Sequence, residues 1–296
     1  MRGPNKPKPL TPQELRALFT VDKFRLLTFD QGVRLGLGNK NQVRDIFEKL
    51  VNLKLIGRTE QRDPDVLSKL PYLHFLKPAG ARALEAALGE PGTAAKRRVR
   101  TQNEVRHRMG VVELRMALEI WLKASNFWQL EAFTTDFEPG SKGRAKATAF
   151  QKMRERDRAG YPPDATAHLR DGDGTLWGIL FEYERGGARG DLSRFKRQKL
   201  PLLRELAGGQ PRNSADEPLE PYFVEEQFAE GMQKAVRFAI VFEDEARRDR
   251  ALKGWPEPTS PDWTRFFIKA LPELETDFNG GWWRPDGTQR PLFLLS

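Results

Sequence analysis

Three acidic residues, Asp164, Glu182 and Glu184, fall within one predicted β-hairpin of the sequence. The turn of this hairpin is the run Asp171-Gly172-Asp173-Gly174, whose residue types favour a tight reversal between two extended segments. If Asp171 stands opposite Thr175, the same register puts Asp164 directly across from Glu182. Side chains alternate between the two faces of a strand, so Glu184 shares the face of Glu182. The other face of that strand then carries Trp177, Ile179, Phe181 and Tyr183.

Three carboxylates on one face of a half-buried sheet repel one another unless a cation lies among them. Hard oxygen ligands of this kind suit Mg²⁺ or Mn²⁺. An ion held in this way can activate water and neutralise the charge that grows on a phosphoryl oxygen. We therefore predict a divalent-metal site for phosphodiester chemistry, formed by Asp164, Glu182 and Glu184. The alternative is that the acids lie exposed on an edge strand and only keep it soluble.

Positive charge is concentrated in the first hundred residues, which contain 20 Lys and Arg against 10 Asp and Glu. Residues 211–296 instead contain 11 against 16. The whole chain has a formal net charge of +9 and a sequence pI of about 9.7. Such an asymmetry is expected when one part of a protein meets a polyanion, and nucleic acid is the polyanion that this pI favours. A basic surface that serves only solubility is the alternative.

The pattern of apolar residues predicts several helices in this basic segment. A capping-box pattern that starts at Thr11 predicts a first helix, Phe24 begins a second apolar segment, and Phe29 begins a short third one. Asn39 is predicted to cap a stronger helix that runs to about Leu53. Two short extended runs and a closing helix follow, which together give the order of a winged helix-turn-helix domain.

The stronger helix would take the recognition position of that domain, with Lys40, Asn41 and Arg44 facing outward near its start. Arg58 in the first extended run adds a cation to the wing. A basic connector rich in Gly and Pro follows the closing helix and contains Arg97 and Arg98. We predict that these six residues contact DNA. A solvated helix face in a protein-interaction domain is the alternative.

Composition excludes several other classes of protein. The chain has no cysteine, which removes disulfides, thiolate nucleophiles and thiolate zinc sites. We find no apolar run long enough to span a bilayer and no signal-peptide pattern, so we expect a cytoplasmic protein with no membrane partner. The predicted organisation is a flexible basic arm over 1–9, a winged helix-turn-helix domain over 10–90, a basic linker over 91–103 and a second domain over 104–296.

The second domain resembles the PD-(D/E)XK nuclease-like fold in the order of its pieces. These are a long helix, a strand, a strand that begins at Pro163-Asp164, a strand with Glu182-Tyr183-Glu184, a helix rich in Lys and Gln, and a strand over 236–242. The whole chain, over about residues 12–255, resembles the replication-relaxation family, which joins a winged helix to such a domain. This resemblance implies an α+β protein of two domains, in which the winged helix-turn-helix precedes a nuclease-like mixed sheet flanked by helices.

The sequence departs from the nuclease pattern at Glu184, where that pattern has lysine. In that superfamily the lysine can come from the next helix, and Lys199 and Lys196 are the candidates here. The alternative is a three-carboxylate version of the site. A covalent relaxase would also need a tyrosine nucleophile, and Tyr161 is the candidate because it lies three residues before Asp164.

Two function classes follow from the resemblance. The first is a metal-dependent nicking or relaxase-like endonuclease of a plasmid or other mobile element, acting at an origin of transfer or replication. The second is a non-catalytic DNA-binding accessory or regulator that keeps the nuclease fold as a scaffold. Double-stranded DNA is the expected partner of both. Single-stranded DNA at a nick, a second copy of the chain and other mobilisation proteins are further candidates, and a protein–protein adaptor would leave the charge asymmetry unexplained.

Overall fold

The computed structural model describes residues 9–59, 71–89, 92, 102–135, 163–186, 192–193, 195–207, 236–255 and 261–293. The chain divides into two compact units, Met1–Val112 and Glu113–Ser296. The boundary lies inside helix α5 (Gln102–Ala124), later in the chain than the predicted start of the second domain at residue 104. Within the described ranges, no helix is both long enough and apolar enough to cross a membrane.

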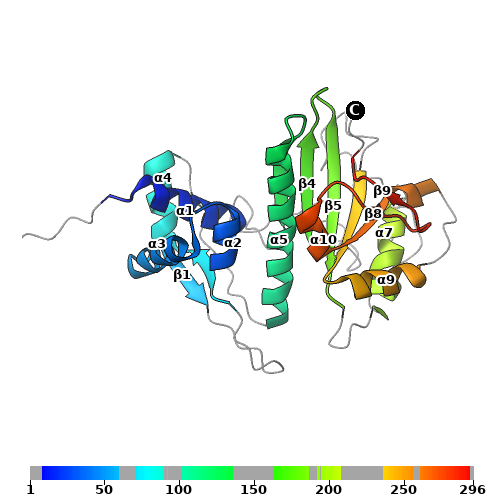
Figure 1. The fold of residues 1–296 in the computed structure, drawn as a ribbon, viewed down its shortest axis with the longest axis horizontal. Helices are drawn as coiled ribbons and strands as arrows, with labels where there is room; N and C mark the ends of the chain where they lie inside the picture. Colours follow the sequence, from blue (N-terminus) through cyan, green and yellow to red (C-terminus); the bar gives the residue numbers. More distant parts are fainter. Residues whose placement is uncertain are drawn as a thin grey trace, which may run out of the picture. The chain divides into compact units, whose positions relative to one another are not determined.

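The first unit contains three helices, a two-stranded antiparallel hairpin and a further helix, which is the order predicted for a winged helix-turn-helix (Figure 1). Each of the first three helices begins at a capping box, formed by Thr11 with Glu14, Thr28 with Gln31, and Asn39 with Gln42. Such a box satisfies backbone N–H groups that have no partner inside the helix. The elements are α1 (Pro12–Phe24), α2 (Phe29–Arg34), α3 (Lys40–Asn52), β1 (Ile56–Thr59), β2 (Leu73–Leu76) and α4 (Pro78–Leu88).

The prediction of a separate segment beginning at Phe24 is wrong, because α1 continues to Phe24. Leu27 instead lies in extended backbone and pairs with His74 of β2: the Leu27 N–H donates to the His74 carbonyl over 3.0 Å, and the His74 N–H donates back over 2.8 Å. This pairing joins residues far apart in the chain, so local apolar spacing could not reveal it.

His74 is buried at the centre of this unit. Its ring centroid lies 4.7 Å from those of Phe29 and Phe47, and its Nδ1 lies 3.1 Å from the carbonyl oxygen of Leu27. The carbonyl oxygen can only accept, so Nδ1 carries the proton and donates. Burial lowers the pKa of His74 to about 4, because the aromatic surroundings disfavour the charged imidazolium.

Acid should therefore destabilise the first unit through His74. Between pH 6.5 and 4 the unfolded chain takes up a proton that the folded chain refuses, so stability falls as the pH falls, by about 3 kcal/mol across the window. Hydrogen exchange of the α3 amides, measured from pH 7.5 to pH 4.5, reports this loss. His74→Phe should show a flatter pH dependence than wild type, and an equal slope in both proteins would contradict the assignment.

The second unit is built on a seven-stranded mixed sheet with the order β3-β4-β5-β6-β7-β8-β9. The interior strand β5 pairs antiparallel with β4 and parallel with β6, and β6 pairs parallel with β7. The strands are β3 (Gln129–Thr135), β4 (Ala165–Arg170), β5 (Leu176–Glu184), β6 (Val236–Phe242), β7 (Phe266–Ala270), β8 (Trp282–Trp283) and β9 (Gln289–Arg290). The helical segments after α5 are η1 (Phe195–Lys199), α7 (Leu200–Ala207), α9 (Glu245–Lys253), η2 (Pro261–Arg265) and α10 (Leu271–Thr276).

The predicted register of the β4–β5 hairpin is confirmed. Ala165 pairs with Phe181 and Arg170 with Leu176, and the Asp171 N–H donates to the Thr175 carbonyl over 3.0 Å. The turn is held by the Asp171 carboxylate, whose Oδ1 accepts the N–H groups of Asp173 and Thr175. Because this turn fixes the register, Asp164 falls opposite Glu182, as the sequence predicts.

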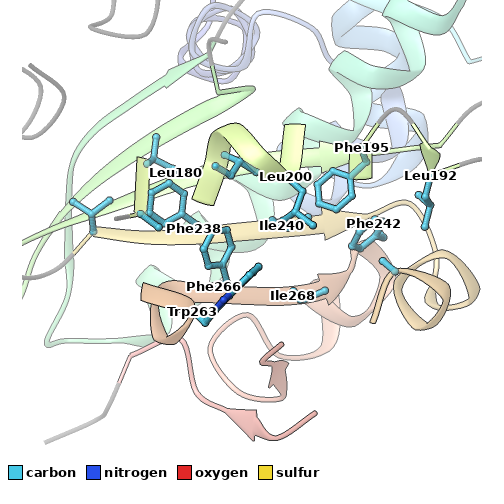
Figure 2. Close-up of a cluster of buried hydrophobic side chains, with 14 residues drawn as sticks. Leu180, Leu192, Phe195, Leu200, Phe238, Ile240, Phe242, Trp263, Phe266 and Ile268 are labelled. Atoms are coloured by element: carbon cyan, nitrogen blue, oxygen red, sulfur yellow. The ribbon is translucent and has the colours of Figure 1, made fainter. Parts of the chain in front are cut away.

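The two faces of β5 contact different layers. Phe181 packs toward Phe133 and Phe278, on the face that also receives Trp121 of α5. Leu180 points to the opposite face and joins the apolar cluster beneath α7 and α9 (Figure 2). Each large apolar side chain buried there contributes about 1.5–3 kcal/mol. The labelled members are Leu180, Leu192, Phe195, Leu200, Phe238, Ile240, Phe242, Trp263, Phe266 and Ile268.

Candidate functional site

The three predicted acidic residues are buried in the second unit. Glu182 and Glu184 lie at the carboxyl end of the interior strand β5, and Asp164 directly precedes β4. The exposed fractions of Asp164, Glu182 and Glu184 are 6%, 1% and 9%. The alternative that these acids are exposed on an edge strand is therefore wrong.

Asp164 is anchored to the backbone of the neighbouring strand. Its Oδ2 accepts the N–H of Tyr183 over 2.7 Å. This bond orients the carboxylate beside β5. The side chains of Glu182 and Glu184 project from the same face of β5 as Leu180, because alternate residues of a strand point the same way.

Lys199 supplies the cation of the cluster. It is the last residue of the π-helical turn η1, which directly precedes α7. Its Nζ lies 3.1 Å from Glu182 Oε2 and also forms an ion pair with Glu184 Oε1. Lys199 is 8% exposed, so the pair is shielded from water. We name Asp164, Glu182, Glu184 and Lys199 the carboxylate–lysine cluster.

The second candidate lysine does not join this cluster in the structure. The ammonium of Lys196 lies against Gly254 at the carboxyl end of α9, where a Cβ on Gly254 would collide with it. A cation is favoured there because the last carbonyl groups of a helix carry partial negative charge. Of the two lysines predicted from the sequence, Lys199 alone contacts the carboxylates.

The environment of Glu182 strongly disfavours its charged form. Burial raises its pKa well above the usual range, the charges of Asp164 and Glu184 raise it further, and Lys199 opposes them. Its second oxygen, Oε1, is buried and accepts no hydrogen bond within the described residues. An unsatisfied buried carboxylate oxygen is costly, and perturbed groups of this kind concentrate at functional sites.

The carboxylate oxygens of the cluster are ligands that a hard divalent ion prefers, but in this structure Lys199 occupies the position between those of Glu182 and Glu184. Within the parts of the chain that the structure describes, no group of three His, Asp or Glu side chains is placed to hold a metal ion. Lys199 engages Glu182 and Glu184, and Tyr183 engages one oxygen of Asp164. Glu182 Oε1 is buried without a hydrogen-bond partner and Lys199 already contacts Glu182 and Glu184, so metal binding here would compete with the lysine.

A second charged network lies beside the carboxyl ends of β5 and β6. Arg185 Nε lies 3.4 Å from Glu243 Oε1, and Arg247 binds Glu243 Oε2 over 3.2 Å. Burial raises the pKa of the Tyr183 phenol, which this network surrounds. The predicted orientation of Tyr183 away from the carboxylates agrees with these neighbours. The sequence analysis did not identify Glu243, although an acid directly after a buried strand was the available signal.

The predicted DNA-contacting residues of the first unit are at the surface. Lys40, Asn41 and Arg44 are exposed along the first turns of α3, and the Lys40 ammonium lies 3.3 Å from a carboxylate oxygen of Asp30. Arg58 is exposed on β1, with its guanidinium carbon 4.9 Å from the ring centroid of Tyr72. The opposite face of α3 is buried through Val43, Phe47 and Leu50. Predicted residues Arg97, Arg98 and Tyr161 lie outside the described residues.

The first unit has the element order of a winged helix-turn-helix, and the second is a mixed α/β sheet unit with a buried acidic cluster. Together they define an α+β protein of two compact units. The chain belongs to the replication-relaxation family, whose model matches residues 16–199. The matched region begins in α1 and ends at Lys199, so it includes all four members of the carboxylate–lysine cluster.

Solved structures give weaker likenesses. One is BpsR of Bordetella bronchiseptica, whose DNA binding is described as regulated by 6-hydroxynicotinic acid. It is 17% identical over 40% of this chain and 81% of that chain, at a TM-score of 0.25. Another is a probable transcriptional regulator from Pseudomonas aeruginosa, with 23% identity over 39% of this chain and 77% of that chain, at a TM-score of 0.24. At these scores neither likeness supports a conclusion about this chain. A comparison with curated proteins found no match.

Proposed function

We propose that the protein binds duplex DNA through α3 and acts in the cytoplasm on the DNA of a mobile element. The observation that carries this proposal is the exposure of Lys40, Asn41 and Arg44 on the solvent face of a helix whose other face is buried. A helix in this position fits the major groove, where lysine, arginine and asparagine can contact phosphates and base edges. Arg58 on the hairpin extends the positive surface.

Duplex binding by the full chain should weaken steeply with salt, by about 0.9 log unit in affinity per log unit of salt for each phosphate neutralised. Lys40→Ala and Arg44→Ala should each reduce the affinity and make the salt slope shallower. Arg16→Ala, which removes an exposed arginine of α1, is the matched control and should bind as wild type does. Fluorescence anisotropy at several salt concentrations measures all four proteins. Salt-independent binding, or equal losses in all three variants, would contradict this assignment.

We propose further that the carboxylate–lysine cluster serves metal-dependent nicking of that DNA. The buried, unsatisfied oxygen of Glu182 beside Asp164 and Glu184 supports this proposal. Asp164, Glu182 and Glu184 would hold Mg²⁺ or Mn²⁺, and such an ion supplies an activated water and charge neutralisation at phosphorus. Asp164 is kept in place by the Tyr183 N–H, and Lys199 can donate to a phosphate oxygen as negative charge grows on it.

A nicking assay on supercoiled DNA that carries the element's own origin tests this proposal. Wild type should produce the open-circular form, in which one phosphodiester bond of one strand is hydrolysed to a hydroxyl and a phosphate terminus, only when Mn²⁺ or Mg²⁺ is present. The second candidate is the scaffold function, in which the protein binds DNA without cutting it. The ion pairs of Lys199 favour it, because a resident ammonium already compensates the buried charge of Glu182 and Glu184. Tight binding of the origin without any nicking would support that second function.

A further inference from the structure

A second cluster of unusual chemistry lies away from the carboxylates, on the opposite face of the sheet. Arg237 of β6 neighbours Ile179 in the register, so it points to the face opposite Leu180 and Glu182. Its guanidinium carbon lies 4.7 Å from the ring centroids of Trp177 and Phe293 and 5.4 Å from that of Phe267. The guanidinium carbon of Arg284 also lies 4.7 Å from the Phe267 centroid. We name these five residues the arginine–aromatic cluster.

Positive charge exceeds negative charge in this cluster. Burial lowers the pKa of Arg284, the charge of the carboxylate Asp286 opposes this shift, and the charge of Arg290 adds to it. Asp286 Oδ1 already accepts the N–H and the hydroxyl of Thr288.

No ion pair of Arg237 with a carboxylate is found among the described residues, and the charge that acts on it is the like charge of Arg284. Burial, with Arg284, lowers the pKa of Arg237 to about 10. Asp171, which contacts Trp177 of this cluster, is engaged elsewhere: its carboxylate accepts from Trp177 Nε1 over 2.8 Å and from the N–H groups of its own turn.

Among the residues that the structure describes, no protein group accepts a hydrogen bond from either guanidinium. A guanidinium presents five N–H donors in one plane, and aromatic rings over its faces leave those edges available. In the part of the chain that the structure describes, Arg237 makes no hydrogen bond to protein, and Arg284 Nε is buried without a partner. Two half-buried cations that pack against the same Phe267 ring repel each other, and an oxyanion bound by their donors would relieve this repulsion and satisfy Arg284 Nε.

We propose that Arg237 and Arg284 form a binding site for the phosphate group of a nucleic-acid strand. Arginine matches phosphate through paired N–H donors, which suits a doubly charged or bridging phosphate better than a halide. Trp177 is half-buried and offers an aromatic face beside the arginines, as sites that follow a single strand commonly do. The assignment of the ligand to a nucleic-acid strand, and not to a free phosphate, rests on the proposed DNA binding. The assignment of a phosphate group as the ligand does not depend on that proposal.

Thermal unfolding of the full chain, followed by tryptophan fluorescence, tests this site. All seven tryptophans lie in the second unit, so the signal reports the unit that contains the cluster. Inorganic phosphate should raise the Tm with increasing concentration, beyond the effect of chloride at equal ionic strength. An oligothymidylate should do so at concentrations about tenfold lower or less, because adjacent phosphates and a stacked base add to the contact.

Arg237→Met keeps an unbranched side chain among the rings and removes the charge, and Arg284→Gln removes the neighbouring charge. Both variants should lose the phosphate and oligothymidylate shifts, and Arg284→Gln should melt no lower than wild type in chloride because a repulsion is removed. The matched control is Arg170→Gln, an exposed arginine of the same sheet that already has Glu131 as partner. It should keep both shifts. Absence of a phosphate shift in wild type, or its survival in both cluster variants, would overturn the proposal.

Two further outcomes separate this site from the DNA binding of the first unit. A shift with phosphate but none with oligothymidylate would overturn the assignment to a strand. If the strand shift persists in Lys40→Ala and Arg44→Ala while duplex affinity falls, the two sites act independently, as proposed. If wild type does not bind duplex DNA but phosphate still raises its Tm, the proposed function is contradicted and the phosphate site is supported.

Discussion

Lys199→Met should destabilise residues 113–296 by about 3–5 kcal/mol, because it leaves two buried carboxylates without their cation. Lys199 is the ion-pair partner of both Glu182 and Glu184, and the exposed fraction of Glu182 is only 1%. The pKa of Glu182 is already raised, so the carboxyl group can take up a proton when the lysine is lost. The cost should therefore be smaller near pH 5 and larger near pH 8, and denaturant unfolding followed by tryptophan fluorescence measures it.

The neighbouring lysine provides the control for this experiment. Lys196→Met removes an equal charge from the same helical turn, but its ammonium lies against Gly254 and not between carboxylates. We expect a loss well under half of that for Lys199→Met. Adding Glu182→Gln to Lys199→Met should recover part of the stability, because the double variant no longer holds two uncompensated acids. Equal losses in the two lysine variants, or no recovery in the double variant, would show that Lys199 acts only through packing.

The sequence was sufficient to place three of the four cluster members, the carboxylates Asp164, Glu182 and Glu184, on one face of the hairpin. The Asp171-Gly172-Asp173-Gly174 turn permits one tight reversal, and the register that follows from it puts Asp164 opposite Glu182. The capping box at Thr11 and the N-cap residue Asn39 located the starts of α1 and α3, because their hydrogen bonds join residues only a few positions apart. Information of this kind lies within a few residues of the feature it predicts.

Features that depend on contacts between distant segments could not be predicted from the sequence. Lys196 and Lys199 both lie in the π-helical turn η1, and the packing of this turn against distant segments directs Lys196 toward Gly254 and Lys199 toward Glu182 and Glu184. The end of α1 is linked to the pairing of Leu27 with His74, and the arginine–aromatic cluster joins three strands and the residue Phe293. An arginine within the apolar run of β6 was the one visible signal for that cluster.

Asp164→Asn should abolish metal-dependent nicking while leaving the fold and the duplex affinity unchanged. The amide keeps an oxygen that can accept the Tyr183 N–H, so the 2.7 Å bond that orients this side chain can persist. What disappears is the negative charge, which a hard divalent ion needs from its ligands. Removal of a charged ligand should lower the nicking rate about 100-fold or more, since an electrostatic contribution of this kind is worth several kcal/mol at the transition state.

The matched control is Glu243→Gln, which neutralises an acid at the end of β6 that pairs with Arg185 and Arg247 and lies outside the cluster. It should nick as wild type does. In parallel, Mn²⁺ should raise the Tm of wild type and of Glu243→Gln but not that of Asp164→Asn, because an ion that binds only the folded state stabilises it by about 2.7 kcal/mol at 100 times its Kd. If Asp164→Asn retains both the Mn²⁺ shift and the nicking, the cluster is not the catalytic site. If wild type shows neither, Lys199 is the permanent cation of this site and the protein acts on DNA by binding alone.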